Sequence, residues 1–169
     1  MILISKTLRT LPVWVIALAI VCCFALTGNA SERYPEVSPD PVYTPGEVVG
    51  IQMRALGHND RPYENAGIEL AFRFASPLNR QFTGPLEQFT TLFENLAYKP
   101  MLNHVELEMG EGFINSSNAQ IPVVITDATG IRAGYLFNLT RQSSEICNDC
   151  WMTDAVVPLQ IPKQKSPIL

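Results

Sequence analysis

Two cysteines late in the chain have the spacing most often associated with thiol chemistry. Cys147 and Cys150 form a C-x-x-C pair that is followed directly by Trp151. A thioredoxin-like centre needs its first thiolate at a helix N-terminus, where the helix dipole lowers the thiol pKa, whereas this pair lies between two predicted strands. Asp149 between the cysteines would also oppose thiolate formation. We predict a small-ring structural disulfide or a reduced pair at a hairpin tip, with a redox-sensing pair as the alternative.

A metal site would need more ligands than this pair provides. Zinc takes four ligands, mostly thiolates and imidazoles. Beyond the pair, the chain has only His58, His104 and two cysteines, Cys22 and Cys23, inside an apolar N-terminal run. We therefore predict neither a metal nor a cofactor.

Three further side chains could transfer protons if a pocket enclosed them. Asp154 alternates with apolar residues in the last predicted strand, and burial would raise its pKa and suit it to act as an acid or base. His104 falls where the chain enters the predicted sheet, and Tyr98 could donate a proton. The alternatives are a surface carboxylate for Asp154 and a histidine bonded to the backbone for His104.

His58 and Asp60 form a second polar cluster that could act as an acid–base pair. They lie in a predicted turn between Gly57 and Pro62, where polar residues are common for conformational reasons. We interpret them as loop residues.

The N-terminus sets the compartment in which the cysteines would work. Lys6 and Arg9 precede an apolar run over residues 11–26, and small residues follow up to Ala30. This three-part pattern predicts a secretory signal over residues 1–30 that is cleaved after Ala30. The run is shorter than the roughly 20 residues that span a bilayer, so a retained membrane anchor is the second choice. Either way we expect an exported or membrane-anchored protein.

The charge and length of the remaining chain limit its possible partners and its number of domains. The 169 residues include 12 basic and 16 acidic side chains, and residues 1–30 carry two of the basic ones and none of the acidic ones. An acidic mature chain argues against a nucleic-acid partner. Residues 31–43 contain three prolines and predict a linker, residues 44–159 one domain, and residues 160–169 a flexible tail.

Helical periodicity occupies the first half of the predicted domain. Thr44 and Glu47 fit a capping box around Pro45, which predicts a helix that ends at Gly57. A second helix is predicted after Asn65, as its cap, and ends at Ser76–Pro77, and a third covers residues 85–96.

The second half of the domain alternates with a period of two. Strands are predicted over residues 104–109, 119–126, 132–140 and 151–157, with a turn at 127–130. Short connections favour antiparallel neighbours. We predict an α+β domain in which three N-terminal helices pack on a curved four-stranded antiparallel sheet.

Three segments also resemble a known family. Residues 66–89, Leu102–His104 and Cys150–Thr153 are similar to the uncharacterised family called domain of unknown function 4864. The order of helices and strands resembles the cone-shaped fold of nuclear transport factor 2 and the SnoaL-like polyketide cyclases. The resemblance implies a pocket between helices and sheet and a possible homodimer through the sheet, but it identifies no catalytic residue.

We expect a non-enzymatic domain that binds a small apolar ligand or a protein partner. Phe72, Tyr98, Tyr135 and Trp151 are the predicted pocket residues. The alternative is an isomerase, dehydratase or cyclase in which Asp154 or His104 is the base and Tyr98 or Tyr135 the donor. A second alternative is thiol-redox sensing by Cys147 and Cys150.

Overall fold

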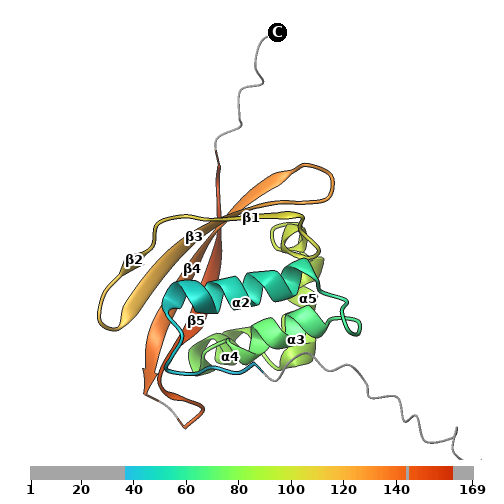
Figure 1. Ribbon diagram of the computed structural model, residues 1–169. Helices are drawn as coiled ribbons and strands as arrows, with labels where there is room; N and C mark the ends of the chain where they lie inside the picture. The colour runs from blue at the N-terminus through green and yellow to red at the C-terminus, as the bar shows by residue number, and fades with distance from the viewer. Residues whose placement is uncertain (1–36, 144, 162–169) are drawn as a thin grey trace, which may run out of the picture. The chain divides into compact units, whose positions relative to one another are not determined.

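The computed structural model describes residues 37–143 and 145–161 (Figure 1). The signal or anchor predicted for residues 1–30, its apolar run 11–26, and the tail beyond residue 161 lie outside the described residues. Within the described ranges, no helix is both long and apolar enough to cross a membrane.

The first described helix, α2 (Pro45–Gly57), begins at the predicted capping box. The Glu47 N–H donates to Thr44 Oγ1 over 3.3 Å, and the Thr44 N–H donates to Glu47 Oε2 over 2.8 Å. Both bonds satisfy N–H groups that have no partner inside the helix. The prediction of this helix is confirmed.

The second helix, α3 (Ala66–Arg73), is capped differently from the prediction. Asn65 holds the predicted N-cap position with the left-handed φ of 62°, but its side chain makes no cap bond. Asn59 replaces it, because its Oδ1 accepts the Ile68 N–H at 3.1 Å while its Nδ2 donates to Asn65 Oδ1.

Helices α2 and α3 lie side by side (Figure 1) and approach closely at Gly67. A Cβ atom at Gly67 would overlap the carbonyl oxygen of Ala55. The glycine is therefore required by the packing of one helix on the other.

Two further α-helices follow, so the described residues contain four. Ser76–Pro77, predicted to end a helix, begins α4 (Pro77–Thr83), where Ser76 Oγ accepts the Asn79 N–H at 3.1 Å. Helix α5 (Leu86–Thr91) continues into the 3₁₀ turn η1 (Leu92–Glu94), and a second turn, η2 (Lys99–Met101), precedes the sheet. The predicted helix at 85–96 is thus shorter and its end is 3₁₀.

The sheet is antiparallel and has five strands, one more than predicted. They are β1 (Glu106–Met109), β2 (Phe113–Ile114), β3 (Asn118–Thr126), β4 (Arg132–Ser143) and β5 (Asn148–Leu159). The order is β1-β3-β4-β5, and β2 also pairs with β3, beyond the end of β1.

A bulge in β5 determines where the site residues point. Thr153 pairs with Leu139, but Ala155 already pairs with Asn138, so Asp154 is an extra residue in the ladder. Such a bulge turns the residues that follow it relative to the partner strand. Val156 then pairs with Phe137, so the side of β5 that faces the helices carries Thr153 and Val156, three residues apart.

One core lies between the helices and the sheet. Alternate residues of β3 and β4 are buried on the side facing α2 and α3, and all four α-helices gather on that side (Figure 1). The largest fully buried side chains are Tyr135, Phe74, Phe137, Met53, Leu56, Ile68, Ile125, Leu139 and Met152. The α+β class with an antiparallel sheet is therefore confirmed.

Candidate ligand-binding cavity

A cavity of about 370 Å³ lies between the helices and the end of the sheet formed by β4 and β5. Its volume falls in the range of roughly 300–1,000 Å³ that is usual for small-molecule sites. The lining residues are Gln52, Leu56, Ala71, Ala75, Asn79, Phe82, Thr83, Phe89, Leu92, Phe93, Tyr98, Met101, Phe137, Thr153, Asp154, Ala155 and Val156.

Most of the wall is apolar and comes from side chains of α2 to α5, of η1 and of β4 and β5. Phe89 and Phe93 belong to α5 and η1, and their ring centroids are 5.7 Å apart in an edge-on arrangement. Phe137 closes the wall from β4. Phe82 on α4 also lines the cavity and is 81% exposed, so the cavity reaches the surface beside this helix.

The polar end of the cavity joins α2, α4 and β5. Thr153 Oγ1 donates to Gln52 Oε1 over 2.7 Å, and Gln52 Nε2 donates to the Ala71 carbonyl over 3.0 Å. Asn79 Nδ2 donates to the Thr153 carbonyl over 3.1 Å, and Thr83 Oγ1 donates to Asn79 Oδ1. These bonds hold buried polar side chains in one orientation.

Sequence reasoning did not identify Gln52, Asn79 or Thr153 as site residues. The sequence carries a signal for Gln52 alone, because this polar residue lies on the otherwise apolar face of its helix. In the structure Gln52 is only 4% exposed. A polar residue on a buried helix face needs a partner or a ligand.

Two of the proton-transfer candidates line the cavity. The Tyr98 hydroxyl donates to the Val156 carbonyl over 3.1 Å. Asp154 is half-buried at the bulge, and its carboxylate accepts no hydrogen bond from the residues that the structure describes. It also borders a second groove together with Phe113, Asn115 and Asn138.

His104 lies away from this cavity. Its Nδ1 is 2.8 Å from the Met101 carbonyl, and its ring packs against Gly57. Burial is the main cause that lowers the pKa of His104, and the charge of His58 adds to it. The arrangement is that of a neutral structural histidine, and the structure does not bring His104 and Asp154 together.

The other three predicted pocket residues are likewise absent from the lining. Tyr135 is fully buried, its hydroxyl donates to the Ala97 carbonyl over 2.9 Å, and burial raises its pKa to about 12. Phe72 packs on the Phe89 ring behind the wall, and Trp151 lies in the core beneath Arg141. Of the predicted set, Tyr98 alone lines the cavity.

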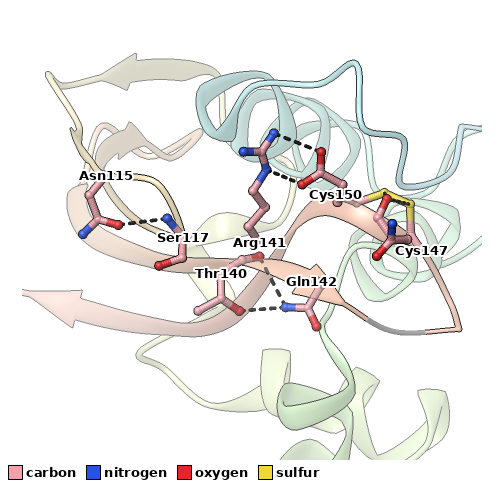
Figure 2. A network of polar contacts seen from close by, with 9 residues as sticks. Asn115, Ser117, Thr140, Arg141, Gln142, Cys147 and Cys150 are labelled. Atoms are coloured by element: carbon pink, nitrogen blue, oxygen red, sulfur yellow. Dashed lines mark hydrogen bonds and ion pairs between the residues drawn. A yellow bond between two sulfur atoms is a disulfide. The ribbon is translucent and has the colours of Figure 1, made fainter.

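Cys147 and Cys150 form a disulfide at the start of β5 (Figure 2). Their Cα atoms are 5.8 Å apart, and Cys150 is fully buried. Cys147 Sγ lies 3.5 Å from the Pro39 carbonyl oxygen, so the disulfide abuts the segment that leads into α2. Asp149 between the cysteines pairs with Arg141 at 2.8 Å. Neither cysteine lines the cavity.

His58 and Asp60 do not bond to each other. Asp60 Oδ1 accepts from Asn59 Nδ2 at 2.8 Å and from the Asn65 N–H at 3.0 Å. His58 Nδ1 lies 3.1 Å from the Arg54 carbonyl. The cluster stabilises the loop between α2 and α3.

No group of three or more His, Cys, Asp or Glu side chains among the described residues is arranged to hold a metal ion. Comparison of the chain with protein-family models, with curated proteins and with solved structures finds no significant match.

Proposed function

We propose that this domain binds a small apolar ligand in the cavity between its helices and β5, without catalysing a reaction. The observation that supports this is the composition of the wall. Aromatic and aliphatic side chains form most of it, and its buried polar side chains are held by partners within the protein. An apolar cavity with a few oriented polar groups is the usual form of a ligand site.

The expected affinity is modest. A ligand that buries about 300 Å² of apolar surface gains on the order of 7 kcal/mol at roughly 25 cal/mol per Å². Association offsets several kcal/mol of this gain. We therefore expect dissociation constants in roughly the high-micromolar to millimolar range.

Binding can be tested with an uncharged solvatochromic dye such as Nile red. The variant Leu92→Trp places a larger side chain in the cavity wall. Its matched control is Leu96→Trp, four residues along, where Leu96 is 84% exposed and absent from the lining. We expect the fluorescence enhancement to fall at least fivefold in Leu92→Trp and to persist in Leu96→Trp. Equal enhancement in both would reject the proposal.

A second candidate is a proton-transfer enzyme, which the shared location of Asp154 and Tyr98 favours. Asp154 would be the base, and Tyr98 would have to give up its bond to the Val156 carbonyl to serve as donor. Exchange of the α-hydrogens of a bound ketone with D₂O, followed by NMR, tests this function. Exchange above the buffer rate that is lost in Asp154→Asn would favour the enzyme, and exchange at the buffer rate would exclude this reaction.

We further propose that the chain has the cone-shaped fold and belongs to the family called domain of unknown function 4864. The supporting features are four helices on one face of an antiparallel sheet with a cavity between them. Superposition on an experimental structure of a family member tests this, and a different strand order would refute it.

We also propose export with cleavage after Ala30, which fits the disulfide at Cys147 and Cys150. The intact mass of protein from its native compartment should correspond to a chain that begins at Ser31 and lacks two thiol hydrogens. A mass that includes residues 1–30 would refute cleavage.

A further inference from the structure

Two primary amides at the polar end of the cavity keep unused hydrogen-bond donors. Gln52 and Asn79 are 4% and 6% exposed. Each amide nitrogen carries two hydrogens. Among the described residues, Gln52 Nε2 donates to one acceptor, the Ala71 carbonyl, and Asn79 Nδ2 to one, the Thr153 carbonyl. One N–H on each side chain therefore has no acceptor among the described residues.

The neighbours fix which end of each amide is the donor. Ala71 and Thr153 present backbone carbonyl oxygens, which would repel an amide oxygen turned toward them. On the other side, the Thr153 hydroxyl donates to Gln52 Oε1. The Thr83 hydroxyl lies 3.1 Å from Asn79 Oδ1 and 3.0 Å from the Asn79 backbone carbonyl, between which its one hydrogen is shared. Each amide oxygen keeps a spare lone pair, but a buried N–H without an acceptor is rarer in proteins than an under-satisfied carbonyl oxygen. The N–H groups are therefore the ones that most need a partner, and an acceptor on a ligand would supply it.

The charges around the cavity decide the kind of acceptor. No Lys, Arg or His side chain belongs to the lining contributed by the described residues, and Asp154 is its one acidic residue. A carboxylate or phosphate would meet no cation and would be repelled by Asp154. A cation would find Asp154 as its one charged partner in the lining, would lose its hydration against an apolar wall, and would face N–H donors at the polar end. An uncharged oxygen acceptor avoids both penalties.

We propose that the ligand is an uncharged molecule with an apolar body and a carbonyl oxygen, such as a ketone or ester, and that Gln52 and Asn79 bind this oxygen. The inference rests on the proposed function and specifies the ligand class for the same cavity. The apolar body would lie against the side of the wall that Phe89, Phe93 and Phe137 form.

Competition between ligands of equal length tests this inference. Displacement of Nile red is measured with 2-octanone, octane and octanoate. We expect 2-octanone to compete about tenfold better than octane, which corresponds to one or two net hydrogen bonds. Octanoate should compete no better than octane.

Two variants remove the donors while keeping the side-chain size, Gln52→Met and Asn79→Leu. In each, the preference for 2-octanone over octane should fall to less than threefold while octane still displaces the dye, which shows that the cavity persists. Gln88→Met is the matched control, because Gln88 is exposed on α5 and absent from the lining. It should retain the tenfold preference.

The outcomes separate the two proposals. Equal competition by 2-octanone and octane in the unmodified protein, tighter competition by octanoate, or an unchanged preference in both donor variants would overturn the carbonyl assignment and leave ligand binding intact. Failure of every compound to displace the dye, together with no effect of Leu92→Trp on the dye, would overturn both.

Discussion

Replacement of Thr153 by valine tests whether the polar end of the cavity is a rigid, buried network. Valine keeps the shape of threonine and suits a strand. It also preserves the backbone bonds by which β5 pairs with the Phe74–Ser76 segment, where the Thr153 N–H donates to the Phe74 carbonyl at 2.9 Å. The one group lost is the hydroxyl that donates to Gln52 Oε1 at 2.7 Å.

The expected loss follows from burial. Thr153 is 1% exposed, so most of the surroundings of its hydroxyl are protein, and only water inside the cavity could reach Gln52 Oε1. A buried acceptor left without its donor costs about 1–3 kcal/mol. The added methyl group recovers up to about 0.8 kcal/mol. We expect the free energy of unfolding to fall by about 1–2 kcal/mol, which lowers the Tm by roughly 4–8 °C for a domain of this size.

Urea denaturation followed by circular dichroism measures this loss, with Thr126→Val as the matched control. Thr126 lies in β3 and donates to Glu106 at 2.8 Å on the surface, where water can replace the bond. We expect a loss below about 0.5 kcal/mol there. The double variant Gln52→Met/Thr153→Val should lose about 1 kcal/mol less than the sum of the single variants, since neither partner is then left alone. A Thr153→Val loss equal to that of Thr126→Val, or strict additivity, would refute a buried network.

Three further predictions concern the helix pair, the buried histidine and the disulfide. Gly67→Ala should destabilise the domain by at least about 2 kcal/mol in urea denaturation, because its Cβ would overlap the Ala55 carbonyl; a loss below 0.5 kcal/mol would contradict the close helix approach. Burial lowers the pKa of His104, so the unfolded chain takes up a proton on this imidazole at a higher pH than the folded domain does. The free energy of unfolding therefore keeps its full value above the unfolded pKa of about 6.5 and falls as the pH drops through and below it. The urea midpoint of His104→Gln should vary less between pH 5 and pH 7.5 than that of the unmodified protein, and an equal variation would argue against this cause. Cys147→Ser should lower the free energy of unfolding in urea denaturation by at most about 2 kcal/mol, because the Cys147–Cys150 ring is small. A larger loss would contradict this and would mean that the disulfide also stabilises the contact with Pro39.

The sequence predicts best the elements that local chemistry specifies. The capping box at Thr44 and Glu47 lies within four residues of chain, so its pattern predicts the start of α2. Ser76–Pro77 is ambiguous for a physical reason. Proline forces the preceding residue out of helical geometry, and the extended conformation of Ser76, with ψ of 163°, serves equally to end a helix or to cap a new one.

The short strand β2 escapes prediction because the break before it is a tertiary feature. The Gly110 N–H still donates to the Pro122 carbonyl over 2.8 Å, and residues 111–112 then interrupt the pairing with β3, between the register of β1 and that of β2. Proline tolerates such a break because it has no N–H to donate to a ladder. A strand of two residues carries too little alternation to be recognised.

The cavity could be predicted only in outline. A space between helices and sheet follows from the fold class, but its polar end depends on contacts between distant residues. Thr153 bonds to Gln52 and to Asn79, which are 101 and 74 residues away along the chain. Asp154 reaches the cavity because of a bulge that no local pattern indicates, whereas strict alternation would have placed it on the opposite face from Thr153.

The central claim is that a small apolar molecule enters this cavity, and methionine methyl NMR tests it most directly. Met101 lines the cavity, whereas Met109 lies on β1 and is absent from the lining. During titration with 2-octanone, we predict a saturable chemical-shift change at the Met101 methyl group and little change at Met109. No change at Met101, or equal non-saturable changes at both, would contradict the claim.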